Sequence, residues 1–255
     1  MRHYHGTPLG GTRESVARFV ITGNRHFLVP FPNPDDLSVI AESSCGFCVD
    51  NGAFSAWRSG KPVTDWGPYY DWCTLWCRHP RWDFAVVPDV IGGCEEENDL
   101  LVEEWFARTR LDDGTCAEGA PVWHLHESFD RLNRLMADSR IICLGSSGEY
   151  QNPGTTAWHD RMAKAMDVLC DSTGSPRRKI HGLRMLDPAI VARYPLFSAD
   201  STNVAQNSQL LGRYGMYKPP TQAQRREVLA ARIETTRSPG IWVPAAKQEE
   251  LFSLE

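Results

Sequence analysis

The stretch Pro195-Leu-Phe-Ser-Ala-Asp-Ser-Thr-Asn203 decides the predicted fold. It is typical of an apolar strand that ends at a carboxylate, Asp200, and passes at once into small hydroxyl and amide side chains. An α/β barrel presents reactive groups in this way, at the C-terminal ends of its strands. We therefore expect Asp200 to be a nucleophile that faces a pocket built by the ends of earlier strands. The alternative interpretation is that Asp200 caps a helix beginning near Val204 and satisfies its free N–H groups.

The same pattern recurs along the chain, where apolar runs end in polar or glycine-rich clusters and helical segments usually follow. Several runs are apolar almost throughout, as parallel strands buried on both faces are. The predicted strands are residues 2–6, 26–31, 46–51, 84–89, 122–127, 141–146, 179–183 and 195–200, and the predicted helices are residues 35–43, 66–78, 95–108, 128–137, 158–169, 188–194 and 221–235. Eight strands alternating with helices predict an α/β fold, a single (β/α)8 TIM barrel over residues 1–255.

The composition favours a water-soluble protein. Hydrophobic residues make up 42% of the 255 residues, yet no apolar run approaches the roughly 20 residues that span a bilayer. The N-terminal residues Met1-Arg-His-Tyr-His-Gly6 lack the apolar core of a signal peptide. We expect a cytoplasmic protein with no membrane partner.

The eight cysteines are expected to be reduced thiols, because several fall inside predicted strands or helices. The spacings Cys45-x-x-Cys48 and Cys73-x-x-x-Cys77 raise zinc binding as an alternative. Cys48 lies within the predicted strand 46–51, where its side chain would point into the core. A buried thiol is therefore the favoured interpretation.

Charge is distributed unevenly along the chain, whose net charge is −5. Residues 1–150 contain 13 Lys and Arg against 22 Asp and Glu, whereas residues 151–255 contain 14 against 10. The excess is sharpest in residues 177–237, with 11 basic and four acidic side chains. Such a basic segment on an acidic protein is compatible with a phosphate-backbone partner, although a solvated helical face is the simpler interpretation.

Three aspartates stand at predicted strand ends: Asp50, Asp89 and Asp200. In a barrel these ends converge on one pocket. A buried carboxylate without a partner costs several kcal/mol, so three in one pocket suggest a ligand that forms hydrogen bonds with them. A helix cap or a supporting contact is the alternative for each one taken separately.

Histidines offer a different chemistry. His124 and His126 alternate along one predicted strand, as do His3 and His5, and with Asp200 and His181 they could form the metal site of a barrel hydrolase. Such hydrolases usually also place a metal-bridging Lys or Glu at mid-barrel, and no Lys stands at a predicted strand end.

Four motifs in order resemble those of the tRNA-guanine transglycosylases. Asp50-Asn-Gly-Ala-Phe54 resembles their Asp-Ser-Gly-Gly-(Phe/Tyr) signature, and Leu144-Gly-Ser-Ser-Gly-Glu149 is similar to their Gly-Leu-Ala-Val-Gly-Glu segment. His181-Gly182 stands where the family has a Met-Gly strand end, and Phe197-Ser-Ala-Asp200 where it has the nucleophilic Asp. The resemblance covers roughly residues 45–205.

Two departures point to one branch of this superfamily. The family binds zinc through Cys and His ligands after its last strand, but this chain has no Cys beyond Cys170 and no His beyond His181. The zinc-binding subdomain is therefore expected to be missing. The short chain, beginning with His3-Tyr-His-Gly-Thr-Pro8, looks like the phage DNA-guanine transglycosylases, which insert 7-deazaguanine bases into DNA.

The resemblance implies a role for each matching residue, and no cofactor. Asp200 would be the nucleophile and Asp50 the general acid and base. Asp89 would accept hydrogen bonds from the base, backbone amides near Gly145 and Ser146 would hold its exocyclic oxygen, and Phe54 and His181 would sandwich its ring. Glu149 would orient the loop at Gly145, Glu127 or His126 would take the place of a base-reading Gln, and Asn203 would complete the substrate-binding set.

The partners implied are DNA and a free 7-deazaguanine base such as 7-cyano-7-deazaguanine. The basic residues expected to hold the flanking phosphates are Arg177, Arg178, Lys179, Arg213 and Lys218. Three alternatives stay open at this point: a tRNA-guanine transglycosylase, a metal-dependent barrel hydrolase that uses the histidines, and a non-catalytic nucleic-acid-binding subunit. The oligomeric state is not predicted.

Overall fold

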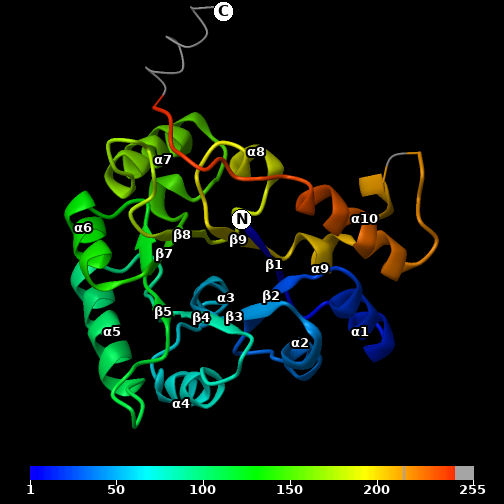
Figure 1. Ribbon diagram of the computed structural model, residues 1–255, viewed down its shortest axis with the longest axis horizontal. Helices are drawn as coiled ribbons and strands as arrows, with labels where there is room; N and C mark the ends of the chain where they lie inside the picture. The colour runs from blue at the N-terminus through cyan, green and yellow to red at the C-terminus, as the bar shows by residue number, and fades with distance from the viewer. Residues whose placement is uncertain (215, 245–255) are drawn as a thin grey trace, which may run out of the picture.

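The computed structural model, which describes residues 1–214 and 216–244, is an α/β fold built on one sheet of parallel strands (Figure 1). The strand order is β5-β4-β3-β2-β1-β9-β8-β7-β6. The strands are β1 (Arg2–Gly6), β2 (His26–Pro30), β3 (Gly46–Asp50), β4 (Trp82–Val86), β5 (Gly119–Ala120), β6 (Val122–His124), β7 (Ile141–Gly145), β8 (Lys179–Gly182) and β9 (Ser198–Ser201).

The two edge strands of the sheet, β5 and β6, are separated by Pro121 alone. On one side the Val87 N–H donates to the Ala120 carbonyl at 3.0 Å, and on the other the Cys143 N–H donates to the Pro121 carbonyl at 2.9 Å. Proline has no N–H to donate, so the ladder is interrupted where the two edges meet. The sheet is therefore a nearly closed barrel.

Helices surround the strands (Figure 1). They are α1 (Arg13–Thr22), α2 (Leu37–Ser43), α3 (Ala53–Arg58), α4 (Gly67–Trp76), α5 (Glu95–Arg108), α6 (Phe129–Asp138), α7 (Thr156–Leu169), α8 (Pro188–Val191), α9 (Asn203–Asn207) and α10 (Gln222–Glu234), with short 3-10 helices η1 (Gly148–Tyr150) and η2 (Leu211–Tyr214).

The predicted elements are confirmed in position. Each of the eight predicted strands overlaps an observed strand, and each of the seven predicted helices overlaps an observed helix, although β4 and α7 begin two residues before their predicted starts and β9 and α6 end one residue after their predicted ends. The sequence did not predict β5, α1 or α3. The strand β5 has only two residues and lies next to a proline. The helix α1 buries only Val16, Phe19 and Val20, so the apolar pattern of the segment between β1 and β2 is weak.

Alternation along the strands divides the core in two. One cluster fills the barrel interior and the other packs the strands against the helices. The interior cluster consists of Tyr4, Leu28, Cys48, Phe84, Val86, Ala120, Val122, Ile141 and Cys143. All eight cysteines lie in the described part of the chain and are free, as expected for reduced thiols.

The outward residues of β1 join the strands to α10. His5 Nε2 lies 2.8 Å from Glu234 Oε1, and Arg25 Nε donates to the same oxygen at 2.7 Å. His3 Nε2 lies 2.9 Å from the Thr236 carbonyl. Burial alone would raise the pKa of Glu234, but hydrogen bonds from His5 and Arg25 and the charge of Arg25 lower it to about 2.

Replacing Glu234 with Gln should destabilise the fold in a pH-dependent way. The pKa of Glu234 is depressed on folding, so its contribution is complete above its ordinary value of 4.5 and is lost as the pH falls toward 2. Because 26% of the Glu234 side chain is exposed, solvent screening reduces the effect to about 1 kcal/mol at pH 7. Urea unfolding of wild type and E234Q at pH 7 and pH 3 should give a larger difference at pH 7, and equal differences would contradict the proposed network.

Candidate active site

The three aspartates at the strand ends line one cavity of about 190 Å³. It lies at the C-terminal ends of the strands, and Phe54, Leu183 and Arg184 are also in its wall. The joint placement of Asp50, Asp89 and Asp200 agrees with the expectation from the sequence. It requires all the strands to run in the same direction, as they do.

Asp200 is 4% exposed, and its contacts leave one carboxylate oxygen available. The backbone N–H of Arg184 donates to Oδ1 at 2.9 Å. His181 Nε2 lies 3.3 Å from the same oxygen but is not aligned for a hydrogen bond, so this contact is electrostatic. Within the described residues, Oδ2 accepts no hydrogen bond from the protein and is free to approach a ligand in the cavity.

Asp200 does not cap the helix that follows it, so the alternative interpretation of this residue is wrong. The N-cap of α9 is Thr202, which makes no side-chain cap. The Asn203 N–H instead receives its hydrogen bond from Ser201 Oγ, at 3.0 Å. The carboxylate of Asp200 turns away from α9 and into the cavity.

Asp89 is held by Asn51, in the turn after β3, and by His124 of β6. Asn51 Nδ2 donates to Asp89 Oδ1 at 3.0 Å and also donates to the Val87 carbonyl at 3.0 Å. His124 Nε2 lies 3.0 Å from Asp89 Oδ2 without the alignment of a hydrogen bond. These contacts fix the carboxylate of Asp89, which is 7% exposed, at the wall of the cavity.

The acidity of Asp50 is strongly perturbed by its surroundings. Burial and the negative charges of Asp200 and Asp89 raise its pKa to about 7, although the Gly52 N–H and the charge of Arg184 oppose the shift. The Gly52 N–H donates to Asp50 Oδ2 at 3.0 Å. Gly52 has φ of 81°, and a Cβ there would collide with the Pro32 ring, so the turn that supplies this donor requires glycine.

Arg184 is a site residue that the sequence did not reveal. It stands one residue beyond the predicted strand 179–183, at a φ of 57°, and its side chain lies at the exposed rim. The guanidinium carbon lies 3.6 Å from the centre of the Phe54 ring, and Nη2 donates to the Ser146 carbonyl at 3.2 Å. The feature of the sequence that could have indicated Arg184 is its position as a single basic residue directly after a predicted strand, in a chain with three acidic strand ends.

Gly145 and Ser146 line the cavity where they were expected. Ser146 Oγ accepts a hydrogen bond from Trp158 Nε1 at 2.9 Å, which fixes the turn after β7. A Cβ on Gly145 would lie 3.0 Å from His124 Nδ1, so glycine allows the close packing of His124 against this strand.

Two residues expected in the pocket belong to the interior of the protein instead. His181 is fully buried beneath Asp200, where its ring packs edge-on against Tyr4 and Phe84, and it cannot sandwich a base. Glu127 is 3% exposed and accepts hydrogen bonds from Arg131 at 2.6 Å, from the His124 N–H at 2.8 Å and from Asn98 at 3.1 Å. Its carboxylate is used by these donors, and it does not reach the cavity.

Three further candidates lie outside the cavity wall. His126 is half-buried, with Nδ1 2.8 Å from Ser147 Oγ and its ring stacked on His124. Glu149 is exposed on η1. Asn203 Oδ1 accepts a hydrogen bond from Asn207 Nδ2 at 3.0 Å along α9.

The basic residues 177–179 are not beside the cavity. Lys179 is the first residue of β8 and Arg177 and Arg178 precede it, so all three stand at the N-terminal ends of the strands. They cannot hold the phosphates that directly flank a nucleotide in the Asp200 cavity. Lys218 is exposed in the segment between η2 and α10, and the side chain of Arg213 falls outside the described residues.

The histidine metal cluster is not assembled. His3 and His5 face α10, on the outer side of the barrel, whereas His124 faces the cavity. Among the described residues there is no group of three or more His, Cys, Asp or Glu side chains that could hold a metal ion. Cys48 lies in the barrel interior and Cys45 is exposed, so the Cys45-x-x-Cys48 pair does not converge either.

Comparison with models of protein families, with curated proteins and with solved structures found no match to this chain. Among the described residues, no helix is long and apolar enough to cross a membrane.

Replacing Asp50 with Asn should stabilise the protein at neutral and alkaline pH. The pKa of Asp50 is raised on folding from 3.8 to about 7, so ionising it destabilises the folded state increasingly between these values and fully above them. The amide keeps an acceptor for Gly52 and removes the charge. We expect a gain of about 1–3 kcal/mol at pH 8 that disappears near pH 4. Chemical unfolding at both pH values measures it, and a D50N protein less stable than wild type at pH 8 would refute the raised pKa.

Proposed function

We propose that this chain is a base-exchange transglycosylase that replaces guanine in DNA with a 7-deazaguanine base. The observation that carries the proposal is the convergence of three carboxylates on one cavity, one with a pKa of about 7 and one with a free oxygen. The motifs in the sequence point to the same chemistry. The fold would be a single-domain (β/α)8 barrel without a zinc-binding subdomain, in which residues 119–124 count as one strand interrupted at Pro121.

The chemistry requires one nucleophile and one group that moves a proton in both directions. Asp200 Oδ2 attacks C1′ of the target deoxyguanosine as the bond from C1′ to N9 breaks, forming a covalent glycosyl-enzyme ester. Asp50, protonated, gives its proton to the departing guanine. The resulting carboxylate then takes the N9 proton of the incoming deazapurine, which attacks C1′ and releases Asp200 with retained configuration. Every proton and electron pair is accounted for by these two residues and the two bases.

A pKa of about 7 suits Asp50 to this role. A group whose pKa is close to the working pH exists in both protonation states, as a residue that donates and then accepts the same proton must. An aspartate of ordinary acidity would be almost fully ionised at pH 7 and would be a poor donor to guanine.

Recognition of the base is assigned to the remaining wall of the cavity. Asp89 would accept hydrogen bonds from the N–H edge of the base, since Asn51 donates to its Oδ1 alone and the contact of His124 with Oδ2 is not a hydrogen bond. Phe54 and Leu183 would form the apolar walls. Leu183 therefore replaces His181 in the proposed sandwich, because His181 lies below the cavity floor.

The target nucleotide has to leave the base stack to reach a cavity at the end of a barrel. Unstacking costs a few kcal/mol and favours a single-stranded or distorted substrate. The alternative is that the same chemistry takes place on tRNA, and assays with DNA and with tRNA as substrates distinguish the two.

Wild-type protein should exchange radiolabelled guanine or 7-cyano-7-deazaguanine into DNA, and both Asp200→Ala and Asp200→Asn should abolish exchange because neither side chain can form the ester. Each reaction is run with DNA and with unmodified tRNA, and nucleosides are analysed by mass spectrometry. Intact-mass analysis of protein trapped with DNA and no incoming base should show a covalent adduct absent from D200N. Exchange that survives in D200A would remove Asp200 as the nucleophile, and exchange confined to tRNA would reject the DNA assignment.

Arg184 should control the pH dependence of exchange. Its positive charge lowers the pKa of Asp50, so Arg184→Gln raises that pKa further and shifts the descending alkaline limb of the pH profile to higher pH. Arg184→Lys keeps the charge and is the matched control, expected to retain the wild-type profile. A reduced rate with an unchanged pH profile in R184Q would show that Arg184 supports only the structure of the site.

A further inference from the structure

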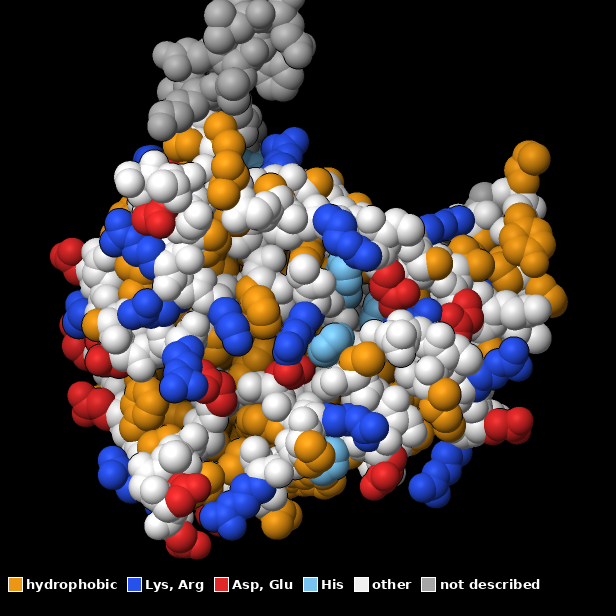
Figure 2. Space-filling view, viewed as in Figure 1, with side chains coloured by type: hydrophobic (Ala, Val, Ile, Leu, Met, Phe, Trp, Pro, Cys, Tyr) orange, Lys and Arg blue, Asp and Glu red, His pale blue; other side chains and the backbone are white. Residues whose placement is uncertain are grey.

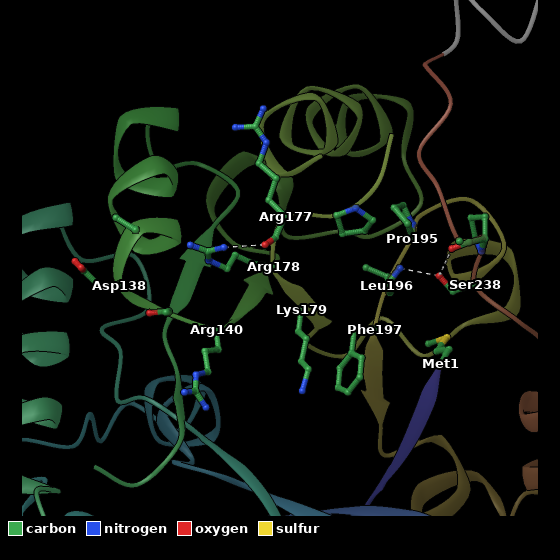
Figure 3. A pocket seen from close by; sticks show the side chains of 15 residues that line it. Met1, Asp138, Arg140, Arg177, Arg178, Lys179, Pro195, Leu196, Phe197 and Ser238 are labelled. Carbon is green, nitrogen blue, oxygen red and sulfur yellow. Dashed lines mark hydrogen bonds between the residues drawn. The ribbon is translucent and has the colours of Figure 1, made fainter. Parts of the chain in front are cut away.

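A second cavity, of about 770 Å³, lies at the opposite end of the barrel (Figure 3). Its wall includes the residues that directly precede β7 and β9, Arg140 and Phe197, and the first residue of β8, Lys179. Because the strands are parallel, these positions stand at the end remote from Asp200. The catalytic chemistry proposed above makes no use of this cavity.

Its charge is strongly positive on a protein that is negative overall. Four basic residues line the cavity, Arg140, Arg177, Arg178 and Lys179, against one acidic residue, Asp138. Figure 2 shows basic side chains gathered on this face over β7 and β8. The whole chain carries −5, so this concentration of cations opposes the average charge and would attract anions.

The cations are poorly neutralised by the protein itself. Within the described residues, Arg177, Arg178 and Lys179 form no ion pair, and Arg140 meets Glu118 only at 3.7 Å, with 87% of the arginine side chain exposed. Mutual repulsion of these side chains is a cost that the folded protein carries without an internal partner. An external anion would remove it.

Two of these four basic side chains, Arg178 and Lys179, are held in place by contacts with the protein. Arg178 Nε donates to the Met136 carbonyl at 2.8 Å and Nη1 donates to the Arg177 carbonyl at 2.9 Å, as Figure 3 shows for the second bond. Lys179 Nζ lies 4.7 Å from the centre of the Phe197 ring, a cation–π contact. These side chains are therefore ordered at the surface before a ligand arrives.

We infer that this cavity is a second binding surface, for the phosphodiester backbone of a nucleic acid. The basic side chains come from two separate segments, are exposed, and face a wide cavity, so they suit a series of phosphates along a polymer. A small phosphate ligand would call for converging buried donors, whereas all four cations here are exposed. The surface is independent of the base-exchange chemistry because it lies at the other end of the barrel.

The test compares two double variants with the same change of charge. Arg140→Gln with Arg177→Gln removes two cations from the cavity, and Arg18→Gln with Lys164→Gln removes two exposed cations from α1 and α7 as the control. Fluorescence anisotropy measures binding of a labelled 30-nucleotide single strand over a series of NaCl concentrations, with no deazapurine present and after thermal melts have shown both variants folded.

The magnitude of the slope of log K against log salt should fall by about 1.4 in the cavity variant and stay at the wild-type value in the control, since each lost phosphate contact on a single strand removes about 0.7 of a released counterion. Equal losses in both variants, or none in either, would overturn the assignment. Tight one-to-one binding of inorganic tripolyphosphate that the cavity variant loses, with DNA binding unchanged, would also overturn it and identify a small phosphate ligand. Since turnover is not measured, the outcome is separate from whether base exchange occurs.

Discussion

Three carboxylates share one small cavity here, and each accepts a hydrogen bond from a donor in a turn at a strand end. The Arg184 backbone N–H donates a hydrogen bond to Asp200, the Asn51 side-chain amide donates to Asp89, and the Gly52 backbone N–H donates to Asp50. Burial, together with the negative charges of Asp200 and Asp89, nevertheless raises the pKa of Asp50 to about 7. These two effects give the site a group that can hold or release a proton near neutral pH.

The order of the elements and the identity of the acidic strand ends could be predicted from the sequence. Strand ends such as Val49-Asp50 and Ala199-Asp200 join an apolar run to a carboxylate, and the parallel arrangement then forces those carboxylates together. The closure at Pro121 could not be predicted in the same way. Two-residue and three-residue strands produce no periodic signal, and their pairing depends on partners far away in the chain.

The side on which each side chain lies was harder to predict than its place along the chain. His181 is one residue before the end of β8, yet this short distance puts it under Asp200 rather than in the cavity. Glu127 follows β6, but Arg131, one helical turn later, draws its carboxylate into the interior. Conversely, Arg184 lies in the wall of the cavity and has a positive φ, a backbone conformation that is uncommon for a residue other than glycine and could not be predicted from the sequence.

The two ends of the barrel are separated by little more than the length of a strand. β8 runs from Lys179 to Gly182, which is about 10 Å at 3.3 Å per residue. The cavities at its two ends nevertheless open on opposite faces of the protein. Double-stranded DNA is stiff over about 150 base pairs, so a straight duplex that lies against one end of so short a barrel cannot also touch the other. Only a flexible single strand, or a sharply bent duplex, could wrap around the protein and contact both ends at once.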